Sequence, residues 1–239
     1  MNGNLNTNLQ ITRRPLSFEG EDENFYPETD GKPMAETDRH RDLMVELIQS
    51  LKNFYAEDSE IYVTGDLFLY YLEGVPQECV APDVMVCFDV PKKERRIYKL
   101  WEEKIAPSVV IELASHSTYK NDREGKRDLY EFLGVKEYFI YNPEYPKTLP
   151  SLLAYRLETG EYQKISIENG RVSSEVLGLD LVDTGSTLRL FNPQTEKFLP
   201  SLAELAGAEE RAELEKQLRF KAEAEIERLK AELAKLKNG

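Results

Sequence analysis

Short apolar runs and amphipathic stretches alternate along the first two hundred residues of the chain. Apolar residues recur at helical spacing over 38–55, which predicts the first helix. Runs rich in β-branched and aromatic residues predict strands at 61–64, 67–71, 83–90, 108–113 and 137–141. A second helix is predicted over 122–134. This order of elements indicates an α/β (α+β) domain built on a mixed sheet.

Three further apolar runs follow, at 152–157, 162–167 and 188–191. They are separated by turn sequences such as Glu-Thr-Gly at 158–160 and Glu-Asn-Gly at 168–170. Glycine and asparagine at such points are typical of tight turns between antiparallel strands. We therefore expect these runs to add antiparallel strands to the sheet.

The composition changes near residue 200, where aromatic residues give way to alanine, glutamate, lysine and leucine. We expect a flexible segment at 1–24, a domain at 25–200 and a charged amphipathic helix at 201–239. One apolar stripe follows spacings of four and three along that helix: Leu214, Leu218, Ala222, Ile226, Leu229, Leu233 and Leu236. The stripe predicts either folding back onto the domain or a homo-oligomer, a dimer joined through this possible coiled coil.

Glu112 interrupts the β-branched run at 108–113, and a buried carboxylate is costly unless a cation or metal compensates it. If strands 83–90 and 108–113 pair as an antiparallel hairpin, Asp83 lies beside Glu112. Two such carboxylates share a proton or bind a divalent cation. The alternative is structural: Asp83 follows the turn residue Pro82, and Glu112 pairs with a lysine or arginine.

The predicted helix at 122–134 places Asp122, Lys126 and Tyr130 on one face, because they are spaced by four. Its end signals are an N-cap at Asn121, a capping box completed by Glu124 and a stop at Gly134. The apolar face expected against the sheet comprises Leu129, Phe132 and Leu133. A lone helical lysine is most often a solvated residue paired with a neighbouring aspartate.

The segments APDVMV (81–86), SVVIELASHST (108–118), the Asp122, Lys126 and Tyr130 helix, and GVKEYFIYNP (134–143) together resemble the Uma family of putative endonucleases. That family is a branch of the PD-(D/E)XK restriction-endonuclease-like superfamily. The resemblance covers residues 25–195. It implies an α-β-β-β-α-β core with a helical carboxy-terminal extension, and Mg²⁺-dependent hydrolysis of DNA phosphodiester bonds, with Mn²⁺ as a substitute.

The resemblance also implies roles for individual residues. Asp83 matches the aspartate of the PD motif and Glu112 the acidic residue of the next motif, so both would bind the metal with the backbone carbonyl of Leu113. Ala114 stands where the superfamily has lysine, and Lys126 is the corresponding catalytic lysine here. Residues implied to hold a metal water, orient the site or touch phosphate are Glu46, Ser115, Asp122 and Tyr130.

A formal net charge of −13 opposes binding to a polyanion such as DNA. Two basic clusters, which we expect near the site, oppose that charge locally. The first comprises Lys92, Lys93, Arg95, Arg96, Lys99 and Lys104, and the second Lys120, Arg123, Lys126 and Arg127. The alternative is that they are solvated charges that aid solubility.

The remaining composition narrows the class of protein. No segment is apolar for long enough to span a membrane, and no signal peptide is recognisable, so we expect a cytoplasmic protein without a membrane partner. The two cysteines and two histidines show no zinc-binding spacing and argue against a Ser-His-Asp hydrolase. The rival to a nuclease is a catalytically inactive nuclease fold that recruits a partner through its helical tail. A glycosidase with paired carboxylates is a more distant alternative.

Overall fold

The computed structural model describes residues 26–29, 37–115, 118–144 and 149–237. The chain divides into two compact units, 1–199 and 200–239. The segment expected to be flexible, 1–24, lies outside the described residues.

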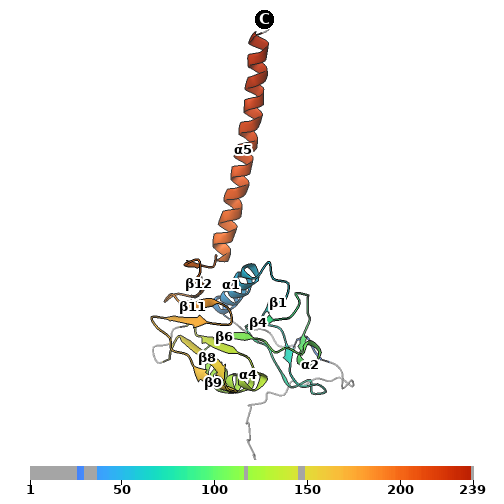
Figure 1. Cartoon of the computed structure of the whole chain (residues 1–239), viewed down its shortest axis with the longest axis vertical. Helices are drawn as coiled ribbons and strands as arrows, with labels where there is room; N and C mark the ends of the chain where they lie inside the picture. The colour runs from blue at the N-terminus through green and yellow to red at the C-terminus, as the bar shows by residue number, and fades with distance from the viewer. Residues whose placement is uncertain (1–25, 30–36, 116–117, 145–148, 238–239) are drawn as a thin grey trace, which may run out of the picture. The chain divides into compact units, whose positions relative to one another are not determined.

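A six-stranded mixed sheet forms the centre of the first unit (Figure 1). Its strands, in spatial order, are β1 (Ile61–Thr64), β4 (Val84–Phe88), β6 (Val109–Leu113), β7 (Glu137–Tyr141), β8 (Leu152–Glu158) and β9 (Glu161–Lys164). Only the β6–β7 pair is parallel, and the other neighbours are antiparallel. Parallel neighbours need a crossover, and the segment between β6 and β7 supplies it with helix α4 (Arg127–Leu133).

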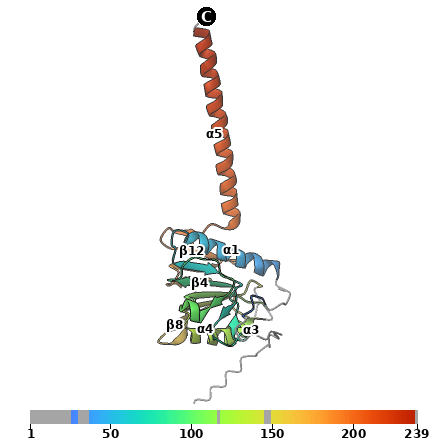
Figure 2. The same cartoon turned by 90° about the vertical axis from the view of Figure 1, so that its right-hand side faces the viewer.

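Helices α1 (Asp38–Phe54) and α4 cover opposite faces of this sheet (Figure 2). Leu47 and Leu51 of α1 pack with Ile111 in one apolar core, and Tyr130 of α4 packs with Val110 in the other. Strand residues therefore alternate between two buried faces, which explains why β4 and β6 are apolar at nearly every position. The order α1, β1, β4, β6, α4, β7 confirms the predicted α-β-β-β-α-β core.

Two smaller sheets complete this unit. The first contains β10 (Arg171–Ser174), β11 (Leu179–Asp183), β12 (Leu188–Asn192) and β13 (Lys197–Phe198). The second contains β2 (Leu69–Tyr70), β3 (Cys79–Val80) and β5 (Tyr98–Lys99), which precedes the short helix α2 (Leu100–Glu103). The expectation that 188–191 extends the main sheet is wrong. That run joins strands 171–174 and 179–183, which the sequence pattern did not reveal. The first is short and alternates exposed and buried residues, and the buried Asp180 interrupts the apolar run of the second.

The helix predicted at 122–134 has a different start. It begins as α3 (Tyr119–Asn121), continues as a π-helical turn η1 (Asp122–Lys126) and ends in α4 at Gly134, whose left-handed φ of 80° confirms the predicted stop. Asn121 has helical backbone angles and caps nothing, so the predicted capping box is wrong. Phe132, expected against the sheet, is 82% exposed, because Tyr130 takes the buried position instead.

The second unit consists of a single helix of 36 residues, α5 (Leu202–Lys237). Leu214, Leu218 and Ile226 of its apolar stripe are each more than half exposed. Within the described ranges, no helix combines the length and apolar character that crossing a membrane requires.

Glu137, at the start of β7, connects the central sheet to the β10–β13 sheet. Its fully buried carboxylate accepts hydrogen bonds from Arg156 Nε at 3.0 Å, from the Ser174 hydroxyl and from the backbone N–H of Glu175 at 3.0 Å. A carboxylate satisfied this fully is a stabilising structural element.

We therefore predict that Glu137→Ala lowers the free energy of unfolding by about 3 kcal/mol, because it leaves the Arg156 guanidinium and several buried donors without an acceptor. Urea denaturation followed by circular dichroism measures the loss. Glu161→Ala, at an exposed position of the nearby strand β9, is the matched control and should change stability little. Equal stabilities for the two variants would contradict the structural role of Glu137.

Candidate functional site

The site begins with the pairing of β4 and β6. Val84 lies opposite Ile111 in an antiparallel register, so the next pair outward is Asp83 and Glu112. This confirms the predicted hairpin pairing of the two strands. On the other side of β4, Gly65 follows β1 and lets the backbone come close to Asp83, because a Cβ at this residue would collide with the Asp83 carbonyl oxygen.

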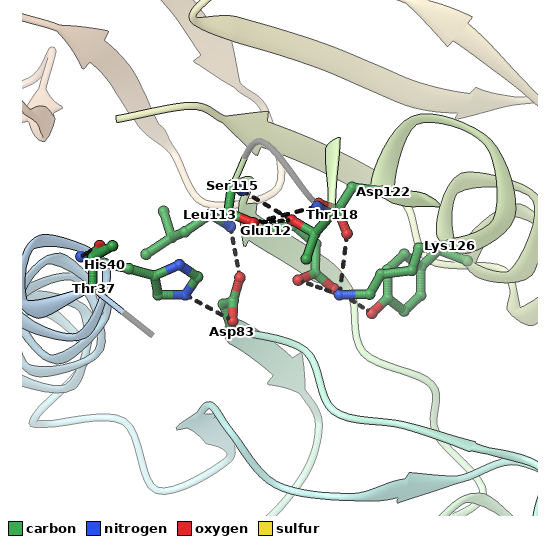
Figure 3. A network of polar contacts seen from close by, with 10 residues as sticks. Thr37, His40, Asp83, Glu112, Leu113, Ser115, Thr118, Asp122 and Lys126 are labelled. Carbon is green, nitrogen blue, oxygen red and sulfur yellow. Dashed lines mark hydrogen bonds and ion pairs between the residues drawn. The ribbon is translucent and has the colours of Figure 1, made fainter. Parts of the chain in front are cut away.

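Glu112 projects from the face of β6 that α4 covers, and its side chain is only 1% exposed. Lys126 Nζ donates to Glu112 Oε2 at 2.8 Å, and the Tyr130 hydroxyl donates to Oε1 at 2.6 Å (Figure 3). Both donors come from the crossover between β6 and β7. The spacing of four between Lys126 and Tyr130 therefore aims two donors at one carboxylate.

Asp122 adds a second buried carboxylate on the same crossover. Its Oδ1 atom lies 3.2 Å from Lys126 Nζ. This oxygen accepts no hydrogen bond of good geometry among the described residues. Both residues lie in the π-helical turn η1, and such turns occur frequently at functional sites. One ammonium group is thus shared between two buried carboxylates.

Asp83 is bound from the other side of the sheet edge. Its Oδ2 accepts a hydrogen bond from the backbone N–H of Leu113 at 2.7 Å, and its Oδ1 lies 3.2 Å from His40 Nε2 (Figure 3). His40 is the α1 side chain that reaches this cluster, and sequence reasoning missed it. The one feature of the sequence that could have indicated His40 is its position near the start of the first predicted helix.

These contacts move the pKa values of the carboxylates apart. Burial raises the pKa of Glu112 well above its usual range; Asp83 and Asp122 add to this rise, and Lys126 offsets only part of it. Burial also raises the pKa of Asp122, again partly offset by Lys126. For Asp83, burial acts in the same direction, but the His40 hydrogen bond and Lys126 outweigh it, so its pKa is lowered.

Lys126 remains an ammonium group in this environment. Burial by itself would lower its pKa, but the charges of Glu112, Asp122 and Asp83 outweigh that effect and raise it. Its side chain is 21% exposed and that of Asp83 15%, whereas Glu112 and Asp122 are 1% exposed each. A molecule arriving from solvent therefore meets Lys126 and Asp83 first.

Two other residues expected to support the site, Ser115 and Glu46, differ in where they lie. Ser115 follows β6 and lies 3.2 Å, oxygen to oxygen, from Thr118, which begins the turn into Asp122. Glu46 is half-buried on α1, and in the described part of the chain the cluster contacts from α1 are made by His40 instead. The expectation that Glu46 supports the site stays a prediction.

The first basic cluster does not lie where we expected it. Lys92 follows the end of β4 remote from Asp83 and donates to the carbonyl of Tyr55 at the end of α1. Arg95 is buried over the Tyr62 ring and paired with Glu103. These cations are used in structural contacts, because the loop that carries them packs against β1. Of the second cluster, Lys120 and Arg123 are exposed on the segment that carries Lys126.

The residues present suit a hard divalent cation by their chemistry. Asp83 and Glu112 supply carboxylate oxygens. The N–H of Leu113 points toward Asp83, and the carbonyl of a strand residue points to the same side as its N–H, so Leu113 supplies a carbonyl oxygen there. No set of three or more His, Cys, Asp or Glu side chains in the described ranges is arranged as a metal cage. Mg²⁺ keeps several waters and needs only one or two carboxylates, so such a cage is not required.

Comparisons with known proteins place the chain in a family. The family model Uma2, described as "Putative restriction endonuclease", matches residues 16–185. A crystal structure described as "a putative nuclease belonging to DUF820 from Anabaena variabilis" is 16% identical, covers 61% of this chain and 76% of its own, and superposes with a TM-score of 0.45. No curated protein matches the chain.

We predict that the Glu112→Gln variant is more stable than the natural protein at neutral pH but equally stable near pH 4. A folded-state pKa above the unfolded value of about 4.3 means that stability declines as pH rises through the interval between the two values. Glutamine removes that decline. Thermal unfolding should show equal stability near pH 4 and, near neutral pH, a gain on the order of 1 kcal/mol or more, about 2–4 °C in Tm per kcal/mol.

The matched control is Glu57→Gln, which alters an exposed glutamate and should change stability little. If Glu112→Gln lost stability at neutral pH, the carboxylate would be a stabilising partner of Lys126, as Glu137 is of Arg156.

A second prediction concerns Gly65. Gly65→Ala should lower the free energy of unfolding by about 1–3 kcal/mol, because its Cβ would collide with the Asp83 carbonyl and lie 2.8 Å from Ile48 Cδ1. Chemical denaturation measures the loss. Gly207→Ala in α5, whose nearest neighbour is a flexible Arg211 nitrogen at 3.5 Å, should not destabilise. A neutral Gly65→Ala would mean that β1 and Asp83 are not in close contact.

Proposed function

The chain belongs to the Uma2 family, and we propose that it is a Mg²⁺-dependent endonuclease that hydrolyses DNA phosphodiester bonds at the Asp83, Glu112 and Lys126 cluster. The observation that carries this proposal is the register pair of Asp83 and Glu112 at one sheet edge, with a lysine ammonium 2.8 Å from Glu112. A buried structural ion pair would need one carboxylate, and here two contact one ammonium group, with Asp83 beside them at the same sheet edge.

Phosphodiester hydrolysis requires a polarised phosphate, an activated water and a cation near the developing negative charge. Asp83, Glu112 and the Leu113 carbonyl would hold Mg²⁺ or Mn²⁺, which supplies Lewis-acid polarisation of the phosphate and a more acidic water. Every other part of the mechanism belongs to side chains of this chain.

Lys126 is the residue that we assign to the developing charge and to water orientation. It is the most exposed member of the buried cluster, and its raised pKa keeps it positively charged. Asp122 positions Lys126 directly, because its carboxylate lies 3.2 Å from the ammonium group. Tyr130 positions Lys126 indirectly, because its hydroxyl binds the Glu112 carboxylate that Lys126 contacts. His40 orients Asp83 through the contact at 3.2 Å.

Binding of the DNA backbone falls to cations close to this cluster. Lys120 and Arg123 are exposed on the segment that carries Lys126, so we assign phosphate contacts to them. With a net charge of −13, few such contacts are available, so the affinity for DNA should be low.

Cleavage of supercoiled plasmid and of single-stranded DNA at low salt, with Mg²⁺ or Mn²⁺, tests the proposal. We expect metal-dependent cutting that Asp83→Asn, Glu112→Gln and Lys126→Met each reduce about 100-fold or more. The matched controls Glu57→Gln and Lys52→Met change exposed residues of the same types and should cut normally. Circular dichroism of each variant separates lost chemistry from lost folding.

Two outcomes would contradict the proposal. Equal residual cutting by all variants would identify a contaminating nuclease. A folded natural protein that neither cuts nor binds Mn²⁺ through Asp83 and Glu112 would favour the rival function, an inactive nuclease fold that serves as an interaction module.

A further inference from the structure

Where its side chains are described, helix α5 exposes apolar residues of its stripe. Leu214 and Leu218 are each 57% exposed and Ile226 is 51% exposed. In proteins, most helical stability comes from packing an apolar face against another surface. We therefore expect the apolar stripe of this 36-residue helix to pack against a surface.

The spacing of the stripe defines a coiled-coil register. Ala222, Ile226, Leu229, Leu233 and Leu236 follow steps of four, three, four and three. The step of three from Ile226 to Leu229 makes Ile226 and Leu233 a positions, with Leu229 and Leu236 at d. Of the two a positions, Ile226 carries the isoleucine that favours two strands when leucine stands at d, and Leu233 carries leucine. The two steps of four from Leu214 to Ala222 form a local stutter, which loosens the supercoil without breaking the stripe.

The charged positions beside this seam fit a second copy of the same helix. In this register Glu225 and Glu232 occupy g positions, and Lys230 and Lys237 occupy e positions. In a parallel dimer, a g residue faces the e residue five positions further along the partner helix. Glu225 then faces Lys230 of the partner subunit, and Glu232 faces Lys237 of the partner subunit.

The antiparallel arrangement is disfavoured by the same residues. It brings g positions against g positions and e against e, so Glu225 would face another glutamate and Lys230 another lysine. Like charges across a seam cost affinity, and this repulsion selects one orientation. We propose that α5 forms a parallel, in-register two-stranded coiled coil with a second copy of this chain.

Charge exchange in the full-length protein tests this proposal. One variant carries Glu225→Lys and Glu232→Lys, and the other carries Lys230→Glu and Lys237→Glu. Each alone makes every g–e′ contact repulsive, and we expect at least a tenfold weaker dimer by sedimentation velocity. Mixed in equal amounts, the two variants should form a heterodimer at least as stable as the natural homodimer.

A matched control for the first variant is Glu210→Lys with Glu227→Lys, which changes the net charge by the same amount but lies outside the g and e positions of the seam. It should dimerise like the natural protein. A monomeric natural protein at its highest soluble concentration, or dimers unaffected by the exchanges, would overturn the proposal.

Orientation has a separate readout. Leu236→Cys, made with Cys79→Ser because Cys79 is partly exposed, should form a disulfide-linked dimer on mild oxidation only if the helices run parallel. A dimer without this cross-link would show an antiparallel pair and overturn the orientation. All these measurements read mass or cross-linking, so their outcome does not depend on nuclease activity.

Discussion

The contact between the Glu112 carboxylate and the Lys126 ammonium is the interaction on which the candidate site depends. Glu112 lies in a strand whose five residues are all buried, beneath a helix and between two other strands. A carboxylate in that position requires a cation from the layer that covers it. The π-helical turn before α4 delivers Lys126 at 2.8 Å, so the geometry of the crossover and the charge of the strand depend on each other.

The site is electrostatically under-compensated, and this separates it from a structural ion pair. Glu137 on the neighbouring strand is also fully buried, but it has Arg156, a hydroxyl and a backbone N–H around it. Lys126 supplies one ammonium group to two buried carboxylates, Glu112 and Asp122, and an oxygen of Asp122 accepts no hydrogen bond among the described residues. Native proteins accept such a local cost mainly where a function requires it.

The sequence anticipated much of this arrangement for identifiable reasons. Apolar periodicity located α1, β4, β6 and β7, because strands buried on both faces are continuous apolar runs. It did not locate β10, which alternates exposed and buried residues, or β11, whose apolar run is interrupted by Asp180. Apolar periodicity also could not distinguish Glu112, which interrupts an apolar strand, from Glu137, which begins one. Only the partners that other elements supply give the two residues different roles.

The sequence by itself determined the order of the core elements, the unusual carboxylate at Glu112, the spacing of Asp122, Lys126 and Tyr130, and the apolar stripe of the last helix. All of these depend on residues near one another in the chain. Tertiary structure decided which charges meet: His40 reaches Asp83 across 43 positions, while Lys92 and Arg95, near the site strands in sequence, are used elsewhere. Coulombic and hydrogen-bond energies depend on distances and burial, and only the packing of sheet and helices sets those.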